Sequence, residues 1–283
     1  MNDRFGLGWR PELAAGILSN LDRIDIVEVI ADDYFDAPKS KRRALKTLAT
    51  QVPVALHGVT LGLASSIAAD SKRLERTARL ADEIQPEFWS EHLAFVRGGG
   101  LEIGHLAAPP RTEATIEGAA WNLTAAKKIV GTMPLVENVA TLIDPPASQL
   151  SEADWTSEIL AVANCNLLLD LHNLYANAVN FGFDPYAFID RMPQERIHAI
   201  HLAGGRWIKA KTSDERRLLD DHLHDVPDSV YELLKYVAQK IFRPLTVILE
   251  RDGRYPPIEM LLNQLDRARD ALRGGRAKLS EAA

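Results

Sequence analysis

The stretch Met133–Asn173, MPLVENVATLIDPPASQLSEADWTSEILAVANCNLLLDLHN, decides the class of fold. It holds a short apolar run at Met133–Glu137, an amphipathic segment at Ser151–Val162 and a second apolar run at Asn166–Leu171. Short apolar runs of this length are typical of buried strands, and the segment between them predicts a helix with an N-cap at Ser151. The stretch is therefore predicted to be a strand–helix–strand unit of an α/β protein.

The same alternation continues towards both ends of the chain. The predicted strands are Phe5–Trp9, Ile24–Ile30, Val52–His57, Phe88–His92, Met133–Glu137, Asn166–Leu171, Ile197–Leu202 and Leu245–Glu250. The predicted helices are Lys39–Ala49, Ser71–Glu83, Glu113–Val130, Ser151–Val162, Pro185–Arg191, Ser229–Lys240 and Ile258–Leu272. Eight strands interleaved with helices favour a closed (β/α)8 TIM barrel, and 283 residues suit a single such domain. We expect one barrel domain over residues 1–273 and a flexible tail over residues 274–283.

The composition indicates a cytoplasmic enzyme. A net charge of −6 and a pI near 5.8 argue against a broad surface for nucleic acid or anionic membrane. The N-terminal sequence has neither the basic nor the apolar region of a signal peptide, and no apolar run reaches the roughly 18 residues of a membrane-spanning helix. The single cysteine, Cys165, excludes a disulfide within the chain and fits a reducing compartment. We therefore expect neither nucleic acid nor a membrane as partner.

Metal-binding side chains stand at the ends of six consecutive predicted strands. They are His57, His92, Glu137, Asp170, His201 and Glu250. In a (β/α)8 barrel the C-terminal ends of the strands surround one mouth, where active sites of this fold lie. Burying six ionisable groups there without a cation would be very unfavourable, and divalent ions remove that cost. The pattern therefore predicts a metal site.

A second set of such side chains follows two of these strands. If the chain stays extended after Asp170, His172 points to the same face. The loop after the seventh strand has Asp220, His222 and His224 at alternate positions, and in an extended chain these side chains are expected to point to the same side. Histidine and carboxylate donors without cysteine favour iron, zinc or manganese, and their number predicts two or three ions. The residue types do not distinguish iron from zinc.

Other polar residues near these positions have supporting roles or none. Asn138, Asn173 and Asp252 are candidates to hydrogen-bond and orient the ligands. Arg10, after the first strand, either holds an anionic group or forms a salt bridge. His198 has the opposite parity to His201 and is expected to point outward.

Seven segments, in order, resemble the multinuclear non-haem iron-dependent oxidases, a bacterial family that includes the enzyme of methanobactin maturation. They are LHGVTLGLAS, SEHLAF, LVENVA, LLLDLHNLYANAVNFGFDP, IHLAGG, DDHLHDVPDSVYEL and ILERD. The match runs from GLGWRPEL near the start to ILERDGRYPP near the end. The resemblance implies a xylose-isomerase-like barrel with two or three iron ions, including a mixed Fe(II)/Fe(III) pair, and dioxygen as co-substrate.

The resemblance also implies roles for individual residues and a class of substrate. The implied metal ligands are His57, His92, Glu137, Asp170, His201, Asp220, His222 and Glu250, with His172 or Asn173 in addition. Glu137, Asp170, His201 and Glu250 are the expected catalytic residues. Similar enzymes oxidise cysteine or another residue of a ribosomally made peptide, commonly with a small partner protein that presents the leader. We therefore expect an iron-dependent oxidase that modifies a precursor peptide in natural-product maturation.

Three positions depart from the pattern of the family: Ile30, Asp33 and His105. They are expected on rim loops, which set specificity, so the identity of the substrate stays open. Three other functions also stay open: a zinc-dependent phosphodiesterase of the endonuclease IV type, a sugar isomerase with two divalent ions, and a metal-binding protein without turnover. The first would need a basic surface for DNA, and the second a lysine and a buried aromatic residue around a polyol.

Overall fold

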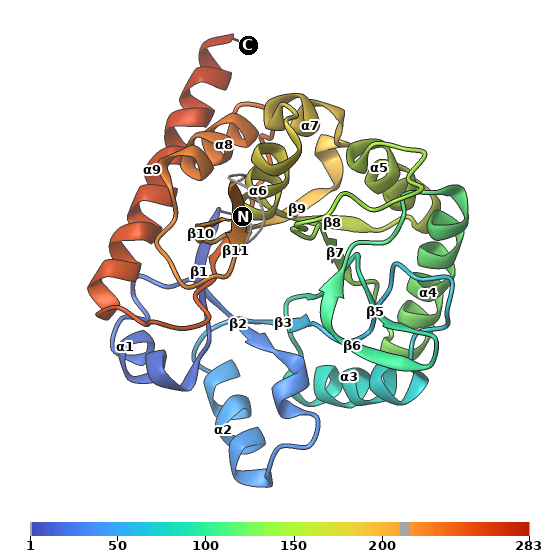
Figure 1. Ribbon diagram of the computed structural model, residues 1–283. Helices are drawn as coiled ribbons and strands as arrows, with labels where there is room; N and C mark the ends of the chain where they lie inside the picture. The colour runs from blue at the N-terminus through green and yellow to red at the C-terminus, as the bar shows by residue number, and fades with distance from the viewer. Residues whose placement is uncertain (1, 210–215, 283) are drawn as a thin grey trace. The chain divides into compact units, whose positions relative to one another are not determined.

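The computed structural model describes residues 2–209 and 216–282 (Figure 1). Eight parallel strands form a closed barrel in the order β1-β12-β9-β8-β7-β4-β3-β2, which confirms the predicted (β/α)8 fold. These strands are β1 (Arg4–Gly8), β2 (Ile26–Ile30), β3 (Val54–Gly58), β4 (Trp89–His92), β7 (Leu135–Glu137), β8 (Asn166–Asp170), β9 (Ile197–Leu202) and β12 (Thr246–Leu249). Each lies within two residues of its predicted bounds. Apolar side chains of these strands, such as Leu56, Leu167 and Val247, are fully buried.

Helices follow the strands, and two of them were not predicted. They are α1 (Ala14–Leu18), α2 (Lys39–Ala49), α3 (Ser71–Ile84), α4 (Glu113–Val130), α5 (Glu152–Ala163), α6 (Leu171–Phe181), α7 (Pro185–Arg191), α8 (Asp228–Ala238) and α9 (Ile258–Ala282). Short 3-10 turns lie at Pro11–Leu13, Ala31–Tyr34 and Gln194–Arg196. The additional helices are α1 and α6. No described helix is long and apolar enough to cross a bilayer.

The described residues divide into two compact units. The first unit consists of the described residues within Met1–Asp25, Ala140–Asp144 and Leu169–Ala283. The second unit consists of Ile26–Val139 and Pro145–Leu168. The prediction of a single domain over residues 1–273 stays a prediction.

In the second unit, parallel pairing sets which side chains lie next to one another. β2 pairs with β3, β3 with β4, β4 with β7, and β7 with β8. The register places His57 opposite Ser90, and His92 opposite Glu137. The antiparallel hairpin β5 (Phe95–Gly98) and β6 (Leu101–Ala107) follows β4 directly. Neighbouring strands therefore present their polar ends side by side.

In the first unit, β12 pairs with both β1 and β9, and His201 lies opposite Ile248. Helix α9 packs along α8 (Figure 1) and continues to Ala282, ten residues beyond the expected end at Leu272. The segment from residue 274, expected to be a flexible tail, is thus helical up to that residue. Within it Arg276 donates to Asp3 Oδ2 at 2.7 Å and to the carbonyl of Arg243 at 2.7 Å, which ties this helix to the start of the chain.

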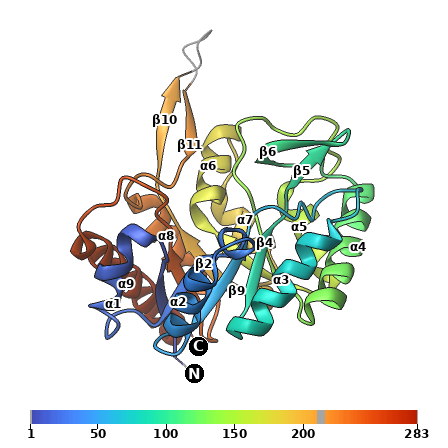
Figure 2. The same cartoon turned by 90° about the horizontal axis from the view of Figure 1, so that it is seen from below.

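Strand β9 is followed by a two-stranded antiparallel ribbon of β10 (Gly205–Lys209) and β11 (Arg216–Asp220). Figure 2 shows this ribbon extending beyond α6 and away from the other helices of the first unit. The ribbon was not predicted, and its last residue, Asp220, is one of the expected metal ligands.

Candidate metal centres

Three buried donors converge at the strand ends of the second unit. His57 ends β3 next to Gly58, His92 ends β4, and Glu137 ends β7. The Nε2 atoms of His57 and His92 each lie 3.4 Å from the same carboxylate oxygen, Oε2 of Glu137. All three side chains are at most 10% exposed, and their donor atoms lie within 4.8 Å of one another. Two imidazoles and a carboxylate at this spacing can hold one divalent ion.

The second nitrogen of each imidazole is held by the surrounding strands. His57 Nδ1 lies 2.8 Å from Ser90 Oγ, and His92 Nδ1 lies 3.2 Å from the carbonyl oxygen of Gly58. A carbonyl only accepts hydrogen bonds, so His92 donates from Nδ1 and its Nε2 keeps the lone pair that a metal requires. Hydrogen bonds of this kind orient metal-binding histidines. The donor set therefore fits the metal that the sequence predicts.

Two further acids lie behind these histidines, and the sequence patterns did not single them out. Glu91 accepts from the backbone N–H of His92 at 3.0 Å and from that of Leu61 at 3.1 Å. Asp32 accepts from the N–H of Val59 at 3.0 Å and from the hydroxyl of Thr60. Burial raises the pKa of Asp32, and the hydrogen bond from Thr60 opposes that rise. Both acids fix the loop that follows β3, the strand from which His57 projects.

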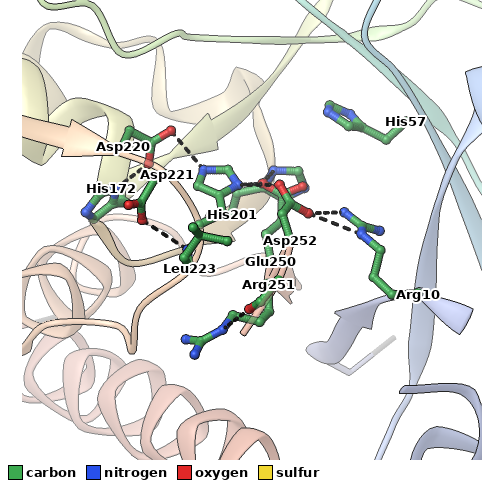
Figure 3. A network of polar contacts seen from close by, with 12 residues as sticks. Arg10, His57, His172, His201, Asp220, Asp221, Leu223, Glu250, Arg251 and Asp252 are labelled. Carbon is green, nitrogen blue, oxygen red and sulfur yellow. Dashed lines mark hydrogen bonds and ion pairs between the residues drawn. The ribbon is translucent and has the colours of Figure 1, made fainter. Parts of the chain in front are cut away.

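The first unit contains a second cluster, of which Figure 3 shows His201 and Glu250. Asp170, His201 and Glu250 are buried, and their donor atoms lie within 4.8 Å of one another. His201 Nδ1 and His222 Nδ1 lie 3.2 and 3.3 Å from the same oxygen, Oε2 of Glu250. Here too two imidazoles meet at one carboxylate oxygen.

A chain of charged groups extends this second cluster in both directions. Asp220 contacts His172 through Oδ1, 2.5 Å from Nδ1, and His222 through Oδ2, 2.9 Å from Nε2. On the other side of His222, its Nδ1 lies 3.2 Å from Asp252 Oδ2. Arg10 donates from Nε to Asp252 Oδ1 at 3.2 Å (Figure 3). Of the two roles expected for Arg10, the structure shows the salt bridge, and this salt bridge holds the carboxylate that contacts His222.

Opposite charges dominate the ionisation of Asp220 and His222. Burial would raise the pKa of Asp220, but the neighbouring His222 and His172 outweigh it and hold that pKa well below its usual range. Burial would lower the pKa of His222, but Asp220 and Glu250 outweigh it and raise that pKa well above its usual range. The raised pKa favours the protonated form of His222, so a cation bound there would compete with a proton.

A family model described as "RiPP precursor modification enzyme MbnB/TglH/ChrH" matches residues 4–273. RiPPs are peptides that are made on the ribosome and then modified. The chain belongs to this family. The match confirms the resemblance seen in the sequence, and the coarser part of the expected function, an enzyme acting on a precursor peptide, follows from it.

Relatives in this family cover the whole barrel. The chain is 33% identical over 275 residues to a UPF0276 protein of Caulobacter vibrioides, covering 97% of this chain and 96% of that protein. It is 31% identical over 277 residues to a UPF0276 protein of Bordetella bronchiseptica, covering 97% and 94%. It is also 34% identical over 276 residues to a UPF0276 protein of Streptomyces avermitilis, covering 94% of this chain and 54% of that protein.

Solved structures with the same fold carry different activities in their names. The D-psicose 3-epimerase of Clostridium cellulolyticum superimposes with a TM-score of 0.60 at 11% identity over 96% of this chain and 99% of its own. Endonuclease IV of Thermus thermophilus superimposes with a TM-score of 0.53 at 16% identity over 98% and 99%. At these identities the similarity shows the xylose-isomerase-like barrel alone.

The structure of this family member corrects two arguments made from strand parity. His172 does not continue an extended strand, because α6 begins at Leu171 and Asp170 is its N-cap. It reaches the cluster from the first turn of that helix. His222 has a φ of +52°, so the alternation after β11 is broken and His224 does not join Asp220 and His222. His224 Nδ1 instead lies 2.9 Å from Asp221 Oδ1.

The remaining predicted positions lie in varied surroundings. Asp170 Oδ1 accepts from the N–H of Asn173 at 2.6 Å, so this pair forms the cap of α6. Asn138 is buried and lines a small cavity with Arg111, Glu152 and Trp155. The departures from the family pattern are Ile30, half-buried, and Asp33 and His105, both exposed. His198 is exposed, as its parity predicts.

Replacing Ser90 with alanine should weaken metal binding at the cluster of the second unit. Ser90 is fully buried and its hydroxyl lies 2.8 Å from His57 Nδ1, so the variant loses the contact that orients this imidazole. Losses of this kind cost about 10- to 100-fold in metal affinity. Competition with a chelator measures the affinity, and Ser90→Thr, which keeps the hydroxyl, serves as the matched variant. Equal affinity of Ser90→Ala and the wild type would mean that Ser90 only fills space.

Proposed function

We propose that the chain is a multinuclear non-haem iron-dependent oxidase that uses dioxygen to modify a residue of a precursor peptide in natural-product maturation. Cysteine is the first candidate for that residue, and a small protein that presents the leader is the candidate partner. Membership of the RiPP precursor modification family supports the peptide substrate. The observation that most directly supports a metal site is the pair of imidazoles whose Nε2 atoms both lie 3.4 Å from Oε2 of Glu137.

Two or three iron ions, in mixed Fe(II)/Fe(III) states, are proposed for the chain, with ligands in each of the two clusters. The proposed ligands are His57, His92 and Glu137 in the second unit, and Asp170, His172, His201, Asp220, His222 and Glu250 in the first. Oxygen and nitrogen donors without a thiolate suit iron. Bound iron would supply one-electron chemistry and coordination positions for dioxygen and a substrate thiolate.

The protein's own groups orient these donors and handle protons. Ser90 and the carbonyl of Gly58 fix the two imidazoles of the second unit, and Asp252 contacts His222 in the first. Glu137, Asp170, His201 and Glu250, the proposed catalytic residues, are all buried, so water has little access to them. Asp220 and Glu250 raise the pKa of His222, so an ion bound there would take the place of a proton on this imidazole.

The alternatives have less support in this chain. A sugar isomerase of the predicted kind needs a lysine beside its substrate, and no lysine is buried in residues 2–209 and 216–278. A DNA phosphodiesterase needs a basic surface, whereas the chain has a net charge of −6. A metal-binding protein without turnover would have a saturated coordination sphere and would consume no oxygen when a peptide is added.

The purified protein should carry at least two transition-metal ions per chain, mainly iron when iron is supplied. The two clusters offer nine donors, more than the four to six that one ion takes. Elemental analysis after anaerobic reconstitution measures the count, and Mössbauer spectroscopy measures the oxidation states. One ion or fewer per chain would contradict the proposal.

Oxygen consumption by the ferrous protein tests the reaction. Candidate precursor peptides encoded beside the gene are added one at a time, and each product is analysed by mass spectrometry. We expect peptide-dependent oxygen uptake and a mass change located on one peptide residue. Metal-dependent turnover of a free sugar or of DNA with an abasic site, with no peptide oxidised, would contradict it.

A further inference from the structure

The β10–β11 ribbon has an open hydrogen-bonding edge. Asn180, near the end of α6, pairs with the backbone of Leu218 in β11: its Nδ2 donates to Leu218 O at 2.9 Å, and Leu218 N donates to its Oδ1 at 2.7 Å. The backbone groups of Leu218 therefore point away from β10. Paired residues in an antiparallel ladder alternate between hydrogen-bonded and non-bonded pairs. Leu218 and its partner Trp207 are thus a non-bonded pair, and the N–H and C=O of Trp207 point outward from β10.

Nothing in the described part of the chain pairs with this outer edge as a strand, because the ribbon is a two-stranded sheet. Unpaired edges of this kind accept an extended peptide as an additional strand, and the backbone hydrogen bonds supply affinity. The outer edge of β11, in contrast, is already occupied at Leu218 by Asn180. The edge of β10 is therefore the one open to a peptide.

The side chains beside this edge are aromatic and cationic. Trp207 is 45% exposed, and the guanidinium of Arg216 lies 5.2 Å from its ring centroid. The register places Trp207, Lys209 and Arg216 on one face of the ribbon, since Lys209 pairs with Arg216 and lies two residues from Trp207. The described ribbon strands carry four cations, Arg206, Lys209, Arg216 and Arg217, and one acid, Asp220. The sequence between the two strands adds one cation, Lys211, and two acids, Asp214 and Glu215, so residues 205–220 have a net charge of +2. In a chain with a net charge of −6, this local positive charge favours an acidic partner.

The same face leads to the metal cluster of the first unit. Gly205 lies opposite Asp220 at the base of the ribbon, and Asp220 contacts both His172 and His222. A Cβ at Gly205 would lie 2.2 Å from the carbonyl oxygen of Leu219 in β11 and 2.7 Å from His172 Cε1, so the ribbon needs a glycine at this position beside the imidazole. A peptide bound along β10 would therefore run towards a proposed metal ligand.

We propose that the outer edge of β10, with Trp207 and Arg216, binds an acidic, extended segment of the precursor peptide as an added β-strand. This inference rests on the proposed function, because it takes the precursor peptide as the occupant. The cations on the opposite face of the ribbon have partners within the chain: Arg206 pairs with Asp221 at 3.2 Å, and Arg217 donates to the carbonyl of Asn180. Arg216, whose guanidinium lies 5.2 Å from the centroid of the Trp207 ring, supplies exposed positive charge beside Trp207.

Binding to the metal-free protein tests this inference independently of any oxidation. The probe is a fluorescein-labelled decapeptide of alternating Glu and Val, and its Lys–Val counterpart is the control peptide; fluorescence anisotropy reports binding. We expect the acidic probe to bind, and Arg216→Glu and Trp207→Ala each to weaken it by about five- to ten-fold. Arg273→Glu, a charge reversal at a side chain on α9 that is 77% exposed, should leave binding unchanged. Circular dichroism of each variant shows whether the barrel is intact.

Amide exchange by NMR provides the second measurement. The bound probe should slow exchange of the outward Trp207 amide, whereas the Ile208 amide, which faces β11, should be protected in both states. Equal binding of the Lys–Val peptide, an equal effect of Arg273→Glu, or no binding of the acidic probe would overturn the inference. If the ribbon variants still bind and oxidise precursor peptides normally, the inference is wrong and the proposed function stands. If the probe binds as expected but no precursor peptide is oxidised, the proposed function is wrong and the ribbon remains a peptide-binding edge.

Discussion

Glu137→Gln is expected to lower the iron content by at least one ion per chain and the rate of peptide oxidation by more than about 100-fold. The substitution keeps the size of the side chain and removes the negative charge at Oε2, which lies 3.4 Å from both His57 Nε2 and His92 Nε2. A neutral amide is a much weaker ligand for iron, and it cannot compensate the charge of a cation in a site that is 1% exposed. Elemental analysis and initial rates of oxygen consumption measure the two effects.

The metal-free proteins provide the control for this variant. Without a cation, Glu137 is a buried carboxylate, and its replacement by a neutral isostere removes a desolvated charge. The thermal midpoint of metal-free Glu137→Gln should therefore equal or exceed that of the metal-free wild type. Addition of iron should raise the midpoint of the wild type far more than that of the variant, because only bound metal stabilises the folded state. A variant that is molten without metal would show that Glu137 is structural.

The strand ends were predictable because apolar runs stop where the chain meets polar surroundings. His57, His92, Glu137 and His201 end or nearly end their strands, and Glu250 follows β12 directly, as the apolar-to-polar change in the sequence indicates. The closed barrel followed from the regular alternation of strands and helices over the whole chain.

Helix α6 was not predicted because it is buried on nearly every side. Ten of its eleven residues, Leu171–Asn180, include only one exposed side chain, Val179, so the apolar stripe of a surface helix is missing from LHNLYANAVNF. The apolar residues before it then extend the apparent strand, which led to the wrong expectation for His172. Because α6 begins directly after Asp170, His172 points in a different direction from the one that a continued strand would give it.

The polar groups that hold the ligands were only partly visible in the sequence. Asp252 was singled out by its position two residues after Glu250, and it contacts His222. Ser90, Glu91 and Asp32 were not, because their partners are an imidazole across the sheet and backbone N–H groups of a loop. Likewise, residues other than glycine seldom adopt a positive φ, so the φ of +52° at His222 could not be expected from the sequence and parity alone misplaced His224.

Two substitutions of Asp170 are expected to distinguish its role in metal binding from its role as the N-cap of α6. Its Oδ1 accepts from the N–H of Asn173 at 2.6 Å at the start of α6, and it lies with His201 and Glu250 among the donors of the first unit. Asp170→Asn keeps a good N-cap and loses the charge, whereas Asp170→Ala loses both. We expect both variants to lose metal and to oxidise peptide more than about 100-fold more slowly than the wild type.

Only the alanine variant should also lose stability without metal. Loss of the N-cap costs about 0.5–2 kcal/mol, and each kcal/mol lowers the thermal midpoint of a domain this large by about 2–4 °C. The metal-free Asp170→Asn protein should melt close to the metal-free wild type, since its amide oxygen accepts the same hydrogen bond. If Asp170→Asn retained full metal content, the carboxylate would act only as a cap and the ligand set of the first unit would have to exclude it. If both variants melted alike and lost metal, the hydrogen bond to Asn173 would contribute nothing to stability, and the ligand role of Asp170 would stand alone.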